Sequence, residues 1–331
     1  MIFLSLIVAL AIVQYTTFAA IIQRDTWFIM LINRLRRLPA ISSAPLLPMI
    51  LALTLPLALL VFCMLSVLHY GFPLYLFFIY VPVLLYSLGR GNFVADVNNY
   101  IATATRGDTV AAAKLVDDLS GNLEIVHDSR ETNSWQSLHT QALKIISYRG
   151  FERTFAVLFW FVIAGPLGAL LYRLSVIYRE QAIPHSVDAA MAEKWLWLIE
   201  LPAVRLMGLI WAFVGNFDGC PWRDTLLDTQ SSSISILNRS LRGALSAPSD
   251  AYKASSPSSF SEAGIAQAAD NIAVVEHNEA AEEVIEDLVG ITLSAQWEPA
   301  YSFALVKSSV PLYSRSLLFC VGVIAFATLF I

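Results

Sequence analysis

The stretch that decides the fold reads RGFERTFAVLFWFVIAGPLGALLYRL and covers residues 149–174. Its 19 residues from Thr154 to Tyr172 carry no charge, and charged residues stand at both ends. A helix needs roughly 20 apolar residues to cross the hydrocarbon core of a bilayer. We therefore predict a membrane span near 154–173.

Three small or rigid residues interrupt this run: Gly165, Pro166 and Gly168. Proline removes a backbone donor, and glycine lets another backbone approach closely. We expect a kink or a close helix contact at this point.

The composition of the whole chain also indicates a membrane protein. Of its 331 residues, 57 % are apolar and 14 % are charged, whereas soluble domains have about 45–50 % and 25 %. The net charge of −5 and the lack of a long basic run argue against nucleic-acid binding. The expected partner is therefore the lipid bilayer, with no nucleic acid.

No motif in the sequence predicts catalysis. The three cysteines and five histidines are scattered without metal-ligand or redox spacing, so we expect no metal site and no cofactor. No phosphate-binding loop and no nucleophile elbow occurs either. We predict no catalytic residue.

Further apolar runs surround the central one. The N-terminal membrane region, 1–90, holds predicted spans near 1–22, 46–68 and 73–88, and a C-terminal span is predicted at 312–331. With the central membrane region, 154–215, these runs predict an all-α fold: a polytopic transmembrane helical bundle of about 5–6 spans.

The loop 23–45 orients this bundle. It carries Arg24, Arg34, Arg36 and Arg37 against a single acid, Asp25. Short loops rich in arginine stay in the cytoplasm. We place on the same side the region 91–153, whose apolar residues recur at helical spacing, as a small helical cytoplasmic region.

The second apolar run of the central region, 195–215, is less regular. It contains Glu200, Pro202 and Arg205, and a charge at the bilayer centre costs at least about 2.5–3.5 kcal/mol. The segment is either a kinked span or an interfacial helix, and tryptophans near its ends favour the span. We predict that the backbone bends at Pro202 and that Glu200 and Arg205 pair.

The region 216–311 is more polar. Within it, residues 246–261 read SAPSDAYKASSPSSFS, a composition that buries too little apolar surface to offset the entropy of ordering. We predict that 246–261 is disordered.

The charged residues that flank or enter the central apolar runs are the candidate functional positions. As helix-end anchors they would fix the depth of the helices in the membrane. These candidates are Glu152, Arg153, Arg173, Glu200 and Arg205.

Several short motifs resemble the AmpE family of inner-membrane regulatory proteins. They are LFW at 158–160, GPLGALLYR at 165–173, ATATRGD at 102–108, VRL at 204–206 and AFVGNF at 212–217. The resemblance implies a signalling modulator linked to β-lactamase induction and cell-wall status, without a catalytic residue. It also implies a partner such as a cell-wall-recycling protein or another membrane protein.

The same core is more distantly similar to the cobalamin-biosynthesis membrane synthases, related to adenosylcobinamide-phosphate synthase. That similarity leaves a membrane-embedded synthase as the alternative function. A structural partner of a peptidoglycan amidase or permease is a third possibility.

Overall fold

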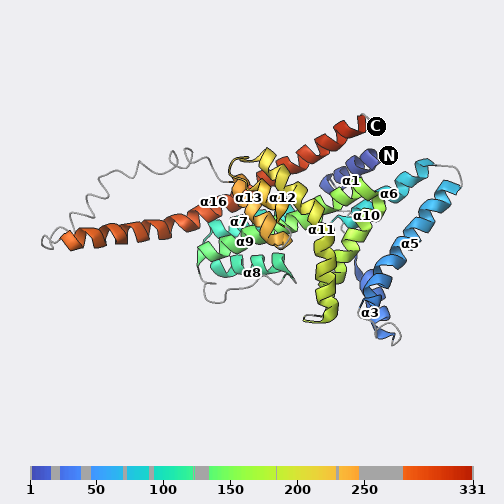
Figure 1. Ribbon diagram of the computed structural model, residues 1–331, viewed down its shortest axis with the longest axis horizontal. Coiled ribbons are helices and arrows are strands. Elements are labelled where there is room, and N and C mark those ends of the chain that lie inside the picture. Colours follow the sequence, from blue (N-terminus) through green and yellow to red (C-terminus); the bar gives the residue numbers. More distant parts are fainter. Residues whose placement is uncertain are drawn as a thin grey trace.

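The computed structural model describes residues 2–15, 23–38, 46–69, 73–88, 93–121, 123, 134–183, 185–228, 231–245 and 279–329. Within these ranges the regular structure is helical and contains no strand. The predicted all-α membrane fold is confirmed. The longest helix, α16 (Glu279–Leu329), runs along the long axis of the molecule, and its C-terminal part lies beside α1 (Figure 1).

The N-terminal region consists of α1 (Ile2–Tyr15), α3 (Thr26–Arg37), α5 (Leu47–His69), the short η1 (Pro73–Leu76) and α6 (Phe77–Ser87). The elements α5 and η1–α6 correspond to the apolar runs 46–68 and 73–88. The first run is described as a helix only to Tyr15, because 16–22 lie outside the described residues.

The region after α6 is helical, as its apolar spacing predicts. It contains α7 (Phe93–Thr105), α8 (Thr109–Ser120) and α9 (Trp135–Gly150). Asp108 accepts a hydrogen bond from the Ala111 backbone N–H, and Ser134 accepts one from that of Ser137. Both side chains thus cap a helix start whose first amides have no partner within the helix.

The predicted boundary at 153 lies inside a continuous helical path. From α9 the chain passes through one π-helical turn, η2 (Phe151–Phe155), directly into α10 (Ala156–Glu180). A π turn holds an extra residue and rotates the side chains that follow it. The helical region 91–153 and the central apolar run are therefore joined by one continuous helical path.

The path reverses inside α10, at Gly165. This glycine has φ 63° and ψ −153°, a conformation open essentially to glycine alone. Pro166 then starts the second arm. At this first helical position a backbone N–H would have no partner within the helix, so a proline costs no hydrogen bond there. A Cβ on Gly168 would lie 2.5 Å from the carbonyl oxygen of Trp160, so the arms touch at the apex and only glycine fits there.

The distances between the arms show how far the chain turns back. A straight helix would separate Glu152 and Arg179 by about 40 Å, but their side chains are 2.7 Å apart. The kink or close contact expected at Gly165, Pro166 and Gly168 is thus a complete reversal, so the predicted span near 154–173 is not a single straight helix. The uncharged run folds at its middle into a helical hairpin, which we call the Gly165 hairpin (residues 149–180).

The remaining helices pack around this hairpin. They are α11 (Val187–Val214), α12 (Trp222–Leu227), α13 (Ser233–Leu245) and α16. Pro202 does not interrupt α11, which continues as one helix from Val187 to Val214. The predicted disordered segment, 246–261, lies outside the described residues.

Four helical runs among the described residues are long and apolar enough to cross a membrane: Leu47–His69, Trp135–Glu180, Val187–Val214 and Ala300–Phe326. Two shorter apolar helices, Phe3–Val13 and Leu74–Ser87, accompany them. The second of the four contains the Gly165 hairpin.

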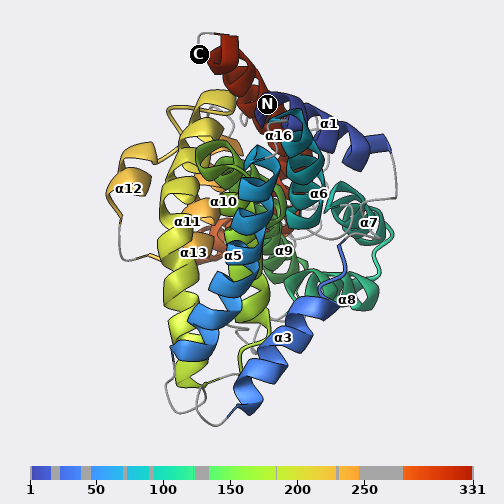
Figure 2. The ribbon, with the colours of Figure 1, turned by 90° about the vertical axis from the view of Figure 1, so that its right-hand side faces the viewer.

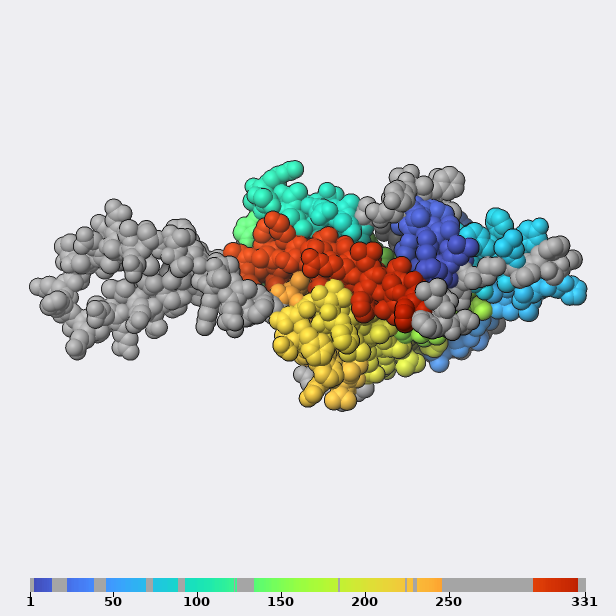
Figure 3. Space-filling model, turned by 90° about the horizontal axis from the view of Figure 1, so that it is seen from above, coloured from blue at the N-terminus to red at the C-terminus, as the bar shows by residue number. Residues whose placement is uncertain are grey.

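Two hydrophobic clusters form the interior. The larger one joins α9, α10, α11, α13 and α16, and the smaller one joins α3, α5, α10 and α11. Figure 2 shows α5, α10 and α11 side by side, and Figure 3 shows α16 lying between α7 on one side and α11–α13 on the other. The Gly165 hairpin contributes to both clusters and so occupies the centre of the fold.

Candidate functional site

Buried charges gather where the two arms of the Gly165 hairpin meet at their charged ends. The Glu152 carboxylate, with only 4 % of the residue exposed, accepts a hydrogen bond from Arg149 at 2.5 Å and one from Arg179 at 2.7 Å. Arg149 also contacts Glu180 at 3.3 Å. Charge-assisted bonds of this kind are about twice as strong as neutral ones, so they hold the arms together.

Arg149 also connects the hairpin to α8. Its Nε donates to the carbonyl oxygen of Leu119 at 3.0 Å, and its Nη2 donates to that of Ser120 at 2.6 Å. These are the last carbonyls of α8, which lack partners within the helix and carry its negative dipole end. The guanidinium thereby neutralises a helix end and a carboxylate at once.

Glu200 on α11 extends the cluster to a third helix. Its Oε1 accepts hydrogen bonds from the hydroxyls of Tyr148 at 2.8 Å and Tyr172 at 3.1 Å. Arg179 donates to the Tyr148 hydroxyl at 2.6 Å. A continuous path of polar contacts therefore leads from Glu200 through Tyr148 and Arg179 to Glu152.

We call this set the hairpin network. Every one of its charged groups has an oppositely charged or hydroxyl partner, which is what allows charges to be buried at a tolerable cost. Its members are Tyr148, Arg149, Glu152, Tyr172, Arg179, Glu180 and Glu200.

A second group of ion pairs holds α3 against the hairpin. Arg173 bonds Asp25 at 2.8 Å, and Arg36 bonds Asp188 at 2.8 Å. The Tyr178 hydroxyl donates to the same Asp188 at 2.7 Å. These contacts fix the arginine-rich helix to α10 and to the start of α11.

Arg153, the remaining candidate on the hairpin, lies outside the network. Its Nη1 contacts Asp96 on α7 at 3.2 Å, and the side chains are 20 % and 42 % exposed. An ion pair this exposed contributes little to stability. Arg153 stands inside the continuous path from α9 to α10 and not at a helix end, where a helix-end anchor would lie.

The predicted pair of Glu200 and Arg205 is wrong. Glu200 bonds the two tyrosines, whereas Arg205 donates to the carbonyl oxygen of Asp228 at 3.4 Å. Residues five apart on an uninterrupted helix point about 140° away from each other. Because α11 stays helical through Pro202, the two side chains point away from each other.

Sequence reasoning missed most of the network. Of its seven members only Glu152 and Glu200 were among the predicted candidates. The available signal was the placing of Arg149 and Glu152 before Gly165 and of Arg179 and Glu180 at similar distances after it. A hairpin with its apex at Gly165 brings these charges together, whereas a straight span separates them.

The fold and the network define an all-α membrane protein whose central helical hairpin is joined to its neighbours by buried ion pairs. The family model described as regulatory signalling modulator protein AmpE matches residues 1–275. The chain therefore belongs to the AmpE family. No curated protein and no solved structure matches it, so the similarity to cobalamin-biosynthesis synthases has no support from these comparisons.

Proposed function

We propose that this AmpE-family chain is a multi-pass inner-membrane modulator of β-lactamase induction that responds to cell-wall status and is not an enzyme. Family membership over 1–275 supports the regulatory role. The apolar helices support the location in a membrane. A cell-wall-recycling protein or another membrane protein would be the partner that receives or supplies the signal.

The hairpin network is the observation that carries the proposal. It links α8, α9, η2, α10 and α11 through side chains that are buried, apart from the part-buried Arg179 and Glu180. Coupling between distant sites needs a physical element whose arrangement both sites can bias. A shift of α11 in the membrane would change the bonds of Glu200 to Tyr148 and Tyr172 and, through the network and Arg149, the position of α8.

The same geometry favours a modulator over a synthase. Two cavities among the described residues can be compared with the network: one is lined by α3, α5 and α10, and the other by α7, α9 and α16 with the turn after α7. Neither lining includes a member of the hairpin network. The network charges thus bond one another and line neither of these two cavities, which suits transmission better than catalysis.

A gene replacement in the bacterium that encodes the chain tests this function. The chromosomal copy is replaced by Glu200→Gln, which keeps the shape but weakens the bonds from Tyr148 and Tyr172, and β-lactamase activity is measured before and after exposure to a β-lactam. We expect an altered induction curve with an unchanged amount of membrane-inserted protein.

The matched control is Glu193→Gln, because Glu193 is on the same helix but exposed. It should leave induction as in the wild type. Induction that is the same in the wild type, in Glu200→Gln and in a complete deletion would contradict the proposed function.

A further inference from the structure

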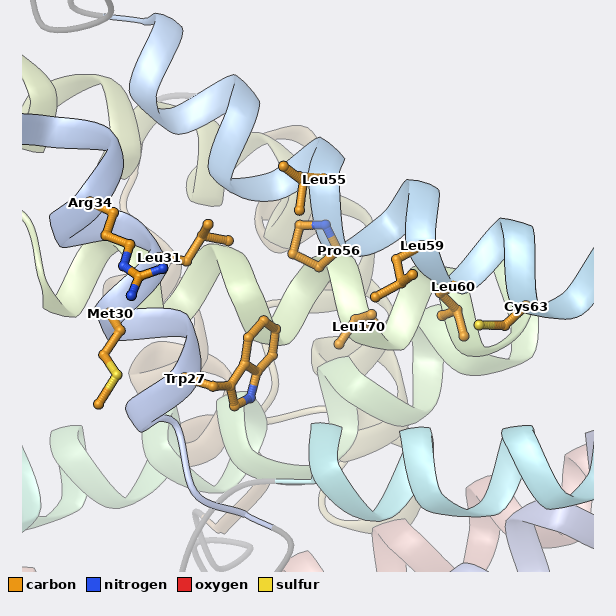
Figure 4. A pocket seen from close by; sticks show the side chains of 10 residues that line it. All are labelled: Trp27, Met30, Leu31, Arg34, Leu55, Pro56, Leu59, Leu60, Cys63 and Leu170. Carbon is orange, nitrogen blue, oxygen red and sulfur yellow. The ribbon is translucent and has the colours of Figure 1, made fainter. Parts of the chain in front are cut away.

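An open groove lies between α3, α5 and α10, with apolar walls and one arginine at its end. It has a volume of about 600 Å³, and nine of its ten lining residues are apolar or sulfur-containing. The tenth is Arg34. Figure 4 shows the Arg34 side chain at one end and Cys63 at the other, with Leu59 and Leu60 leading toward Cys63.

The apolar walls of this groove are open to the surroundings. Trp27, Met30, Leu55 and Leu59 are 45–61 % exposed although they line it. In a membrane protein the phase that meets such apolar walls is the hydrocarbon of the lipids. From Leu55 to Cys63 the α5 wall is about 12 Å long, which is enough for a large part of an extended acyl chain.

The charge at the groove's end is uncompensated. The α3 region has five charged residues, and Asp25 and Arg36 are paired with Arg173 and Asp188. The side chains of Arg24, Arg34 and Arg37 have no hydrogen bond or ion pair with any described residue. Of these three, only Arg34 lines the groove.

We propose that this groove binds one anionic phospholipid of the bilayer, with the phosphate at Arg34 and an acyl chain along Leu55, Leu59 and Cys63. Basic pockets between membrane helices on the cytoplasmic side bind anionic head groups in this way. A guanidinium suits a phosphate because it offers two parallel N–H donors. The bound lipid would hold α3 against α5 at the point where Arg173 and Arg36 tie α3 to the hairpin.

The test is lipid retention by the purified full-length protein, measured by native mass spectrometry after titration with phosphatidylglycerol in detergent. Arg34→Gln should weaken retention about fivefold, which is the effect of one arginine near an anionic lipid. Arg37→Gln is the matched control, because Arg37 is on the same helix, exposed and equally unpaired, but does not line the groove. It should change retention less than twofold.

A second pair of variants tests the acyl-chain part. Leu59→Trp should fill the groove and abolish retention. Leu65→Trp is its control, because Leu65 is on the same helix and 60 % exposed, against 61 % for Leu59, but lies outside the groove. Both positions face outward, so neither substitution should prevent folding.

The ligand series identifies the source of the phosphate. We expect phosphatidylglycerol to be retained and both phosphatidylcholine and glycerol 3-phosphate to be lost. Equal retention of phosphatidylcholine would contradict the proposal, because it would show lipid contact that does not depend on the head-group charge. Equal losses in Arg34→Gln and Arg37→Gln would also contradict it, because they would show a general attraction of anionic lipid to the basic surface. Tighter retention of a polyisoprenyl phosphate would overturn the choice of a bilayer phospholipid. Because this assay needs no β-lactamase readout, its failure is separate from failure of the proposed function.

Discussion

The helix α5 and the Gly165 hairpin are both long apolar runs with an internal proline, yet they fold differently. The helix α5 stays unbroken over 23 residues through Pro56, and its buried residues all lie between Pro48 and Pro56. The hairpin turns back at Gly165 and buries residues along both arms. The helix α5 is a single continuous helix at the edge of the bundle, whereas the Gly165 hairpin forms the centre of the bundle.

The residue before the proline explains the difference. A proline disfavours the helical conformation of the residue before it, but an ordinary side chain also resists a positive φ. Leu55, Val81 and Leu201 precede the prolines of α5, α6 and α11, and these helices continue. Only Gly165 can take φ 63° without a side-chain clash, so only this run reverses.

The largest expected effect comes from breaking the ion pairs that close the hairpin. Glu152→Ala leaves Arg149 and Arg179 without their shared carboxylate, and removing one partner of a buried pair costs about 3–5 kcal/mol. Chemical unfolding in detergent micelles should show a loss of this size. Glu193→Ala, at an exposed position on α11, should change stability by less than about 0.5 kcal/mol.

If Glu152→Ala and Glu193→Ala were equally mild, the buried network would not be what separates the hairpin from α5.

A smaller effect is expected at the apex. Gly165→Ala forces a side chain into a conformation that glycine alone adopts easily, at a cost of about 1–3 kcal/mol. Gly322→Ala is a close control: a Cβ would meet nothing within 4 Å at either position, and Gly322 has no positive φ. Gly165→Ala should therefore lower the melting temperature, whereas Gly322→Ala should leave it unchanged or raise it slightly.

Equal melting temperatures for Gly165→Ala and Gly322→Ala would mean that the reversal does not depend on the glycine.

The smallest effect is expected at the exposed end of the hairpin. A double-mutant cycle with Arg153→Gln and Asp96→Asn should give a coupling of about 0–1 kcal/mol, since both side chains are partly exposed. The same cycle for Arg173 and Asp25, which are 11 % and 16 % exposed, should give a larger value. A reversed order would show that burial does not rank these pairs.

The sequence predicts the apolar helices well and their paths poorly. Composition and length locate both ends of α5, both ends of the η1–α6 run and the C-terminal end of α11 to within a few residues. They miss the start of α11, which is polar. The Gly-Pro pair also marks the place of the break. The reversal does not follow from these signals, because 19 uncharged residues fit one crossing as well as two short arms.

The site was harder to predict than the fold. Its residues come from three stretches, near 150, near 180 and at 200, and only the three-dimensional turn at Gly165 brings them together. Tyr148 and Tyr172 look like ordinary aromatic residues of apolar helices in the sequence. Glu200 and Arg205 are expected to pair because a proline lies between them. The helix continues through that proline, and its regular spacing turns the two side chains to different faces.

The distance across the Gly165 hairpin tests the central claim most directly. Spin labels on Lys144→Cys and Gln181→Cys, in a chain whose three native cysteines are replaced by serine, report this distance in lipid nanodiscs by double electron–electron resonance. The contacts of Arg149 with Glu180 and of Glu152 with Arg179 predict a narrow distribution below about 30 Å. A distribution centred near the 55 Å or so of a straight helix would contradict the hairpin and the network built on it.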